Sequence, residues 1–201
     1  QTLVKGAFGT ERDLSASSHT AMMGAALDAA STEARVFDLA ILPWSADALS
    51  TQDLARSVVF DAGVPVILVP ATNVPHSIDH IVVAWDGSRV AARALSDALP
   101  LLSDGGRISV VTVQGEKSLD SSGLAQTLAA SLERRGYAAK AIDISLDGRS
   151  IAKALQDTAI AEGAQLLVMG GFGHSRLRDF ILGGATKGVF SDLRLAVLLS
   201  H

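Results

Sequence analysis

"HIVVAWDGSRVAARALSDALPLLSDGGRISVVTVQ", residues 80–114, is the stretch that decides the fold class of this chain. It begins with a short β-branched run, residues 80–85, and ends with a second one, residues 107–114. Between them, residues 88–103 carry apolar side chains at the spacing of a helix that packs one face on a core. A strand, a helix and a second strand in this order predict a right-handed crossover between two parallel strands.

The same alternation continues into the C-terminal part of the chain. Three further helices and three further strands are predicted, at residues 121–136, 139–145, 149–164, 165–170, 175–190 and 195–200. The strand-like runs are almost continuously apolar, which is typical of a sheet with helices on both faces. We therefore predict an α/β fold built on an open, parallel, Rossmann-like sheet.

The first part of the chain has the same pattern of predicted elements as the last part. Residues 37–70 align with residues 164–200 as strand, loop, helix and strand, but the first copy is shorter and lacks the glycines of the second. Ahead of it, residues 1–9 and 19–36 read as a residual strand and a helix, so a β-α-β portion is missing from the first copy. This pattern predicts a tandem repeat with an incomplete, degenerate first copy. The predicted division is a partial domain, a linker and a complete domain, at residues 1–70, 71–78 and 79–201.

The composition is that of a globular protein. Among 201 residues, 48% are hydrophobic and 19% are charged, which favours a packed core over disorder. The net charge is −4 without a basic run, so no nucleic-acid surface is expected. Cysteine is absent, which excludes disulfides and thiolate chemistry, and no apolar run approaches the roughly 18 residues of a membrane span. Since no signal peptide is visible, we expect a cytoplasmic protein without membrane or nucleic-acid partners.

Glycines cluster where the strand 165–170 turns into the next predicted helix, in the stretch "GGFGHSR". Without Cβ atoms, Gly170 and Gly173 allow backbone N–H groups to approach an anion. His174 adds a donor, and Ser175 stands at the N-cap position, where free N–H groups and the helix dipole favour a phosphate. A tight strand-to-helix turn without a ligand accounts for the same glycines, so both interpretations are open at this point.

Two other places belong to the same hypothesis. Gly183 and Gly184 offer a second close approach of backbone to the same phosphates, although close helix–sheet packing also requires small residues. Asp86 follows the strand 80–85, and its carboxylate can accept hydrogen bonds from a ribose or a base, or simply orient the turn. If the strand order reverses between this strand and the one that ends at Gly170, the two sites face each other across one crevice.

Several other kinds of site are excluded by the motifs. The chain has no G-x-x-x-x-G-K-[ST] loop, so it is not a Walker-type nucleotide hydrolase. It has no nucleophile elbow and no Ser-His-Asp order, and no catalytic residue is assigned. His76 and His80 are close in sequence, but they sit at the linker without a carboxylate-rich cluster, so no metal site is predicted there.

With these residues the second half resembles the universal stress protein family. The resemblance covers the predicted complete domain throughout and residues 37–70 in degenerate form, and it rests on "IVVAWDGS" and "MGGFGHSRLRDFILGGATKGVF". The nucleotide-binding pattern of the family is G-x2-G-x9-G-[ST], and its glycines are matched by Gly170, Gly173 and Gly183. Gly184 stands where that pattern has serine or threonine, so one hydroxyl contact to the last phosphate is missing.

The resemblance implies a five-stranded parallel sheet of order 3-2-1-4-5, in the HUP group of adenine-nucleotide alpha-hydrolase-like folds. It also implies ATP, ADP or AMP as the ligand of some members, with magnesium accompanying the nucleotide, whereas other members bind no ATP. Carried over by position, Asp86 would contact the adenosine part, and the backbone of Val113 would pair with the base edge. The ribose and phosphates would be held by Gly170, Gly173 and Gly183. Tandem members pair their halves through the last strands, much as single-domain members dimerise, so intrachain pairing or a homodimer is expected.

Three functions follow as hypotheses. The first is a stress-response module that binds an adenine nucleotide in the second half. The second is a protein–protein interaction module of the same fold, in which the glycines serve packing and side chains such as Trp85 or Phe172 fill the crevice. The third is a slow ATPase, for which only His174 offers a general base and only Asp86 offers a magnesium ligand.

Overall fold

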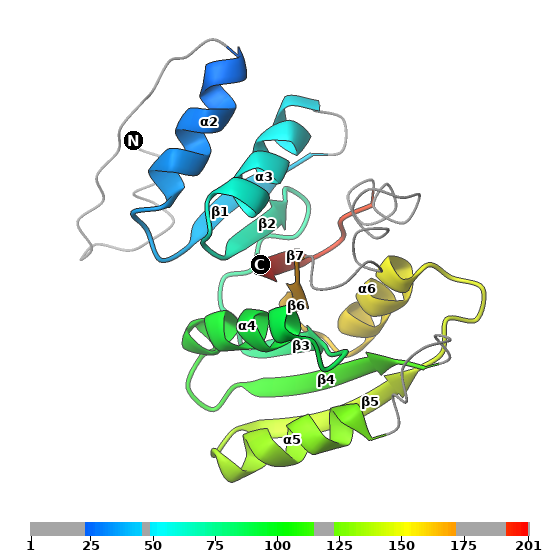
Figure 1. Ribbon diagram of the computed structural model, residues 1–201. Helices are drawn as coiled ribbons and strands as arrows, with labels where there is room; N and C mark the ends of the chain where they lie inside the picture. Colours follow the sequence, from blue (N-terminus) through cyan, green and yellow to red (C-terminus); the bar gives the residue numbers. More distant parts are fainter. Residues whose placement is uncertain (1–22, 46–48, 115–122, 172–191, 201) are drawn as a thin grey trace.

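The structure is a computed structural model that describes residues 23–45, 49–114, 123–171 and 192–200. It is a three-layer α/β fold, with one central sheet and helices on both of its faces (Figure 1). In chain order the elements are α2 (Met23–Ala34), β1 (Ala40–Trp44), α3 (Leu49–Asp61), β2 (Val66–Pro70), β3 (His80–Ala84), α4 (Arg89–Ala98), the 3-10 turn η1 (Leu99–Leu101), β4 (Arg107–Val113), α5 (Leu124–Arg134), β5 (Ala138–Ile144), α6 (Ile151–Ala161), β6 (Leu166–Gly170) and β7 (Ala196–Ser200). The predicted strand 1–9 and helix 175–190 lie outside the described residues.

All seven strands of the described residues form one sheet, in the order β1-β2-β7-β6-β3-β4-β5. The predicted fold class is confirmed, but the prediction of five strands is wrong, and the order over the whole sheet therefore differs from 3-2-1-4-5. The five strands that follow the linker keep the order β7-β6-β3-β4-β5, which is the expected order read from its other edge. The correction has a physical reason: β2 supplies backbone partners to the side of β7 that would otherwise be an open edge.

The join between β2 and β7 is the antiparallel pairing of this sheet, whereas the other neighbouring strands run parallel. Val66 lies opposite Leu199, and Leu68 lies opposite Val197. The exposed fractions of these four side chains are between 0% and 4%, so the first and last parts of the chain meet inside one core. β2 and β7 are therefore interior strands, and β1 and β5 are the edges of the described sheet.

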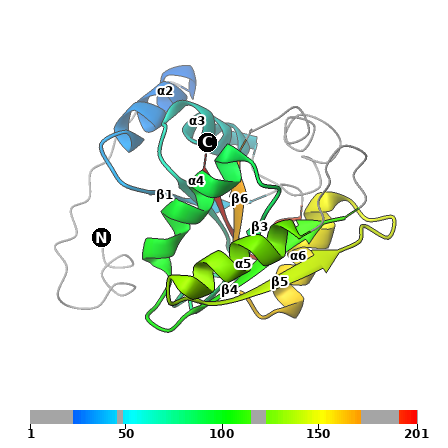
Figure 2. The same cartoon turned by 60° about the horizontal axis from the view of Figure 1, so that its bottom comes forward.

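Alternate residues of the strands point to opposite faces, and each face has its own core. On one face, α3 and α6 pack over side chains that include Leu68, Val82 and Leu167. On the other face, α4 and α5 pack over side chains that include Ile81 and Leu166. Figure 2 shows α4 and α5 crossing in front of the strands and α6 behind them. The continuous apolar runs of the sequence are thus explained by burial on both sides.

The helices begin and end where local chemistry stops them. Ser88 caps α4, because its side chain accepts a hydrogen bond from the backbone N–H of Ala91, and Ser150 caps α6 in the same way. After α5 the chain passes through Gly136 at a φ of +90°, a conformation that favours glycine and ends the helix. None of the described helices is long and apolar enough to cross a membrane.

Candidate functional site

The candidate site lies at the carboxyl ends of β3 and β6, which are parallel neighbours in the sheet. From β3 the chain crosses to β4 on one side, and from β6 it proceeds to β7 on the other. The strand order therefore reverses between β3 and β6, as the family resemblance implies, and ligands of open α/β sheets bind at such a point. Asp86, Val113 and Gly170 are the predicted site residues within the described chain. The other predicted site residues lie outside it: Gly173, His174, Ser175, Gly183 and Gly184.

Asp86 shapes the turn that leads from β3 into α4. Its Oδ1 atom accepts a hydrogen bond of 2.9 Å from the backbone N–H of Ser88. The intervening residue, Gly87, has a φ of +74°, which a residue with a Cβ rarely adopts. The carboxylate is half-buried, and its Oδ2 atom makes no hydrogen bond with a described residue. Asp86 thus orients the turn with one oxygen, and its other oxygen is not engaged by any residue that the structure describes.

Gly170 ends β6 in close contact with the first turn of α4. A Cβ atom at this position would lie 2.7 Å from the backbone nitrogen of Ala91 and 2.7 Å from the carbonyl carbon of Val90. Packing alone therefore requires glycine here, whether or not a ligand approaches. The same contact places Gly170 beside the helix that Asp86 and Ser88 begin, so the structure brings Asp86 and Gly170 to one place.

Val113 lies where the two neighbours of β4 stop pairing at different points. The β3–β4 register ends at Ala84 opposite Val111, whereas the β4–β5 register continues to Val113 opposite Ile144. Since the backbone N–H of Gln114 donates to the carbonyl of Ile144 at 2.8 Å, alternation turns the N–H and C=O of Val113 toward β3. Neither group of Val113 makes a backbone hydrogen bond with a described residue of β3 or of the turn after it. Within the described part of the chain, one main-chain donor and one acceptor at the carboxyl edge are thus without a partner.

Trp85, which the second hypothesis places in the crevice, is half-buried and packs against the core beneath α4 and α5. Phe172, the other side chain of that hypothesis, lies outside the described residues. The described part of the carboxyl edge therefore offers polar backbone and one carboxylate oxygen, and the indole contributes to the core.

A buried polar cluster that the sequence analysis missed lies at the opposite, amino end of the sheet. His80 is 2% exposed, and its Nε2 atom lies 2.9 Å from Oγ of Ser109, which is 0% exposed. The Ser109 hydroxyl donates to Oε2 of Glu162 at 3.2 Å, and the ammonium of Lys140 pairs with the same oxygen at 2.5 Å. The available signal was a serine inside the apolar strand "RISVVTV". Because Ser109 is shut off from solvent, this His-Ser-Glu arrangement is structural.

Charges around this cluster fix the protonation of its members. Burial lowers the pKa of His80, and the nearby Arg107 acts in the same direction. The hydrogen bond from Lys140 holds the pKa of Glu162 below its usual range. Since Ser109 gives its hydrogen to the carboxylate of Glu162, its oxygen must accept from His80, which is therefore protonated at Nε2. The buried Nδ1 atom is left without a partner among the described residues.

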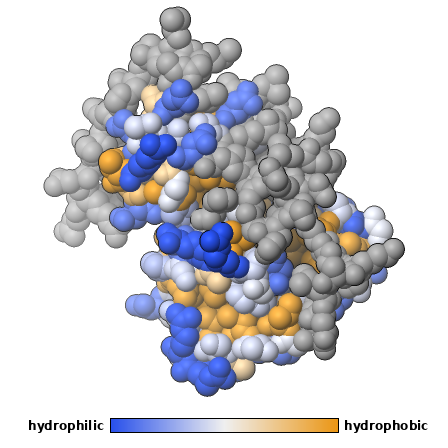
Figure 3. All heavy atoms as spheres, in the orientation of Figure 1, coloured by the Kyte–Doolittle hydropathy of each residue, from blue (hydrophilic) through white to orange (hydrophobic). Residues whose placement is uncertain are grey.

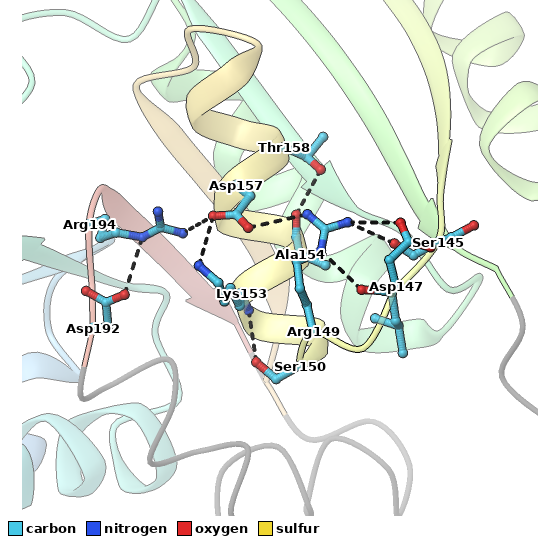
Figure 4. A network of polar contacts seen from close by, with 11 residues as sticks. Ser145, Asp147, Arg149, Ser150, Lys153, Ala154, Asp157, Thr158, Asp192 and Arg194 are labelled. Atoms are coloured by element: carbon cyan, nitrogen blue, oxygen red, sulfur yellow. Dashed lines mark hydrogen bonds and ion pairs between the residues drawn. The ribbon is translucent and has the colours of Figure 1, made fainter.

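A second polar network ties the start of β7 to α6 (Figure 4). Asp157 on α6 pairs with Arg149 at 3.3 Å and with Arg194 at 2.5 Å, and the bond from Arg194 lowers the pKa of Asp157. Gln156, which is 1% exposed, donates to the carbonyl of Asp192 at 3.1 Å and accepts from the N–H of Arg194 at 2.9 Å. These bonds fix the chain just before β7, so that the strand enters the sheet in register beside β6.

Comparisons with known proteins agree with this architecture. The profile of the Universal stress protein family matches residues 77–201. A universal stress protein from Archaeoglobus fulgidus DSM 4304 has a solved structure that superposes with a TM-score of 0.67 at 19% identity, over 89% of this chain and 64% of that one. This chain thus spans less than two thirds of the length of that relative. At such identity the likeness shows the fold alone.

Two shorter relatives are also similar. A universal stress protein family member from Burkholderia pseudomallei is 28% identical, with a TM-score of 0.41 over 61% of this chain and 95% of that one. A universal stress protein solved in complex with cAMP is 19% identical, with a TM-score of 0.43 over 62% and 98%. A search of curated proteins gives no match. Because the family profile covers more than half of the sequence, this chain belongs to the universal stress protein family.

Proposed function

We propose that this chain is a binding module that takes an adenine nucleotide at the carboxyl edge of β3 and β6. The observation that carries the proposal is the backbone N–H and C=O of Val113, which have no partner among the described residues, on the same edge as the Oδ2 atom of Asp86, which likewise makes no hydrogen bond with a described residue. Membership of the universal stress protein family supports a role in a stress response. An uncharged donor and acceptor beside one carboxylate suit the base and ribose of a nucleotide, rather than a metal or an acidic partner.

The parts of the ligand divide between described residues and predicted ones. The base edge pairs with Val113, and a ribose hydroxyl donates to Asp86. The phosphates of ATP, ADP or AMP, with magnesium where it accompanies them, fall to Gly173, Gly183 and the N–H groups around Ser175. Because packing against α4 already requires glycine at position 170, Gly170 adds no argument for a phosphate.

A protein–protein interaction module is the second candidate, and an exposed apolar surface favours it. The turn between α2 and β1 exposes Val36 by 79% and Phe37 by 60%, and Ile41 on the edge strand β1 is 58% exposed. Figure 3 shows apolar surface at the place where α2 ends and β1 begins. This surface belongs to the first part of the chain, so an interaction there is compatible with a nucleotide in the second. The slow ATPase gains no support, since its predicted base, His174, lies outside the described residues.

Calorimetric titration with ATP, AMP and cAMP tests the proposal, together with analysis of the supernatant of denatured protein for a co-purified nucleotide. We expect saturable heat with at least one of the three ligands. In Asp86→Asn the amide oxygen still accepts from Ser88, but the second acceptor becomes a donor, so we expect affinity to fall about tenfold, or about 1.4 kcal/mol. Asp104→Asn, in an exposed turn at the amino edge, is the matched control and should bind like the parent. No heat at millimolar ligand and no co-purified nucleotide would sink the proposal.

A further inference from the structure

Thr112 interrupts the pairing of β3 and β4 just before the carboxyl edge. In the parallel ladder, the N–H of Trp85 donates to the carbonyl of Val111 at 2.8 Å. The next bond of a regular ladder would run from the N–H of Val113 to the carbonyl of Trp85. That carbonyl instead accepts a hydrogen bond of 2.9 Å from the side-chain hydroxyl of Thr112. The ladder therefore stops one bond early.

We propose that Thr112 is a positioning residue for the nucleotide site: its hydroxyl takes the Trp85 carbonyl and thereby keeps the backbone N–H of Val113 free for the base. This inference rests on the proposed function for its ligand. It goes beyond that function because it assigns the unpaired state of Val113 to one side chain that touches no ligand.

The burial of Thr112 makes this bond persistent. The side chain is 2% exposed, so water does not compete for its hydroxyl or for the carbonyl that it holds. Val113 is less deeply buried, because its pairing with β3 has ended while its pairing with β5 continues. An unpaired backbone donor is tolerated where solvent or a ligand reaches it. The backbone groups of Val113 that face β3 therefore lie at the half-buried end of the strand, where an unpaired N–H costs less free energy than in the core.

Substitution at position 112 separates this role from simple core filling. In Thr112→Val the hydroxyl is lost while the volume is nearly kept, so the carbonyl of Trp85 becomes available to the N–H of Val113 and the ladder gains its missing bond. Thr112→Ser keeps a hydroxyl, so its side chain should still bind the Trp85 carbonyl and leave the N–H of Val113 unpaired. Thr158→Val is the matched control, because the Thr158 hydroxyl also donates to a backbone carbonyl, that of Ala154 at 2.8 Å, but does so inside α6.

The experiment measures the hydrogen exchange of the Val113 amide by NMR and the affinity for AMP and ATP by calorimetry in these four proteins. In the parent we expect fast exchange at Val113, which slows with saturating AMP. In Thr112→Val we expect slow exchange without ligand and affinity at least about tenfold weaker. Thr112→Ser and the Thr158→Val control should behave like the parent in both measurements. Thr112→Ala, which also removes the hydroxyl, replaces Thr112→Val if that variant does not fold.

The outcomes separate this inference from the proposed function. If the parent binds AMP or ATP and Thr112→Val binds equally well, or if its Val113 amide exchanges as fast as in the parent, the role of Thr112 is wrong. If no nucleotide binds to the parent, the proposed function fails, and a Val113 amide that becomes protected only in Thr112→Val still supports the action of Thr112 on the ladder. Unchanged exchange in that case overturns the inference as well.

Discussion

At the scale of the residue, three local features affect packing and hydrogen bonding: the absent Cβ of Gly170, the hydroxyl of Thr112 and the ring of His80. The absent Cβ of Gly170 lets the end of β6 touch the first turn of α4, and the hydroxyl of Thr112 decides whether Val113 is paired. His80 holds its place through one hydrogen bond to Ser109 while its other ring nitrogen is buried without a partner among the described residues. Each of these positions yields an effect that one substitution can test.

Gly170→Ala should destabilise the fold, because the new Cβ would press into the backbone of α4 at 2.7 Å and neither element can yield cheaply. We expect the free energy of unfolding, measured with urea, to fall by about 1–3 kcal/mol. Gly171→Ala is the control, since its Cβ would meet the Ser200 carbonyl oxygen at the milder distance of 3.2 Å. Equal stability of Gly170→Ala and the parent would show that β6 and α4 are not in contact.

Mild acid should weaken the fold through His80. Burial lowers its pKa in the folded state, so the unfolded chain binds a proton first, at about pH 6.5. The stabilising contribution is fully present above that pH and is lost as pH falls toward the lower folded pKa. A protonated ring would place a second N–H and a positive charge in the core, near the cations Arg107 and Lys140, and the opposing effect of Glu162 does not outweigh burial.

Urea unfolding at pH 7.5 and pH 5.5 measures this loss. His80→Gln has no titrating ring, so its free energy of unfolding should change less between the two pH values than that of the parent. His76→Gln, a substitution of the same kind at an exposed position of the linker, is the matched control for the removal of a histidine. If the free energy of unfolding falls equally between pH 7.5 and pH 5.5 in the parent and in His80→Gln, the acid sensitivity belongs to other groups.

At the scale of the element, the edge strand β1 differs from the strands inside the sheet. It pairs only with β2 among the described strands, and the N–H of Ala40 donates to the carbonyl of Pro65 on that side. Alternation then directs the backbone of Ile41 and Pro43 toward the outer edge. Proline has no N–H, so the edge lacks one donor that another strand would need, a common protection of exposed edges.

Pro43→Val should therefore increase self-association. The substitution restores an N–H on the outer edge of β1, next to Ile41, whose side chain is 58% exposed. Light scattering coupled to size exclusion, over a series of protein concentrations, should show a larger associated fraction than in the parent. Pro100→Val, at an exposed site in η1 away from any edge strand, is the control. If the two variants associate equally, the proline at the edge has no protective role.

At the scale of the whole molecule, the two parts of the chain share one sheet and one set of cores. β2 and β7 pair across side chains that are almost fully buried, and the core beneath α3 and α6 includes residues from both parts. The division into a partial domain, a linker and a complete domain stays a prediction, but the described residues are continuous across it. Separate unfolding of the first part would expose the edge of β7.

The chain should unfold in one cooperative transition, and its two tryptophans can show this. Trp44 lies in the first part and Trp85 in the second, so Trp44→Phe and Trp85→Phe each leave one reporter. In each variant we expect the fluorescence midpoint in urea to coincide with the midpoint by far-ultraviolet circular dichroism. Leu68→Ala, at the join, should move both probes together and cost about 2–5 kcal/mol. A separate, earlier transition reported by Trp44 would contradict the shared core.

Local patterns predicted the elements because their causes are local. The periodicity of residues 80–114 located β3, α4 and β4, and the turn residues Asp86 and Ser88 act as their types suggest. Asp86 and Gly170 both lie beside the first turn of α4, whereas their role as site residues stays a prediction. The glycine pattern beyond residue 171 stays a prediction.

By itself, the sequence determined the α/β class, the order of elements and the apolar strands, because periodicity acts over short stretches, and the reversal between β3 and β6 was implied by the family resemblance. Only the tertiary structure decided that β2 joins β7, that Gly170 is required by α4, and that Thr112 leaves Val113 unpaired. These features depend on which distant backbone groups come within hydrogen-bonding or contact distance. A local sequence pattern does not determine the distance between such groups, because that distance depends on how the helices pack on the two faces of the sheet.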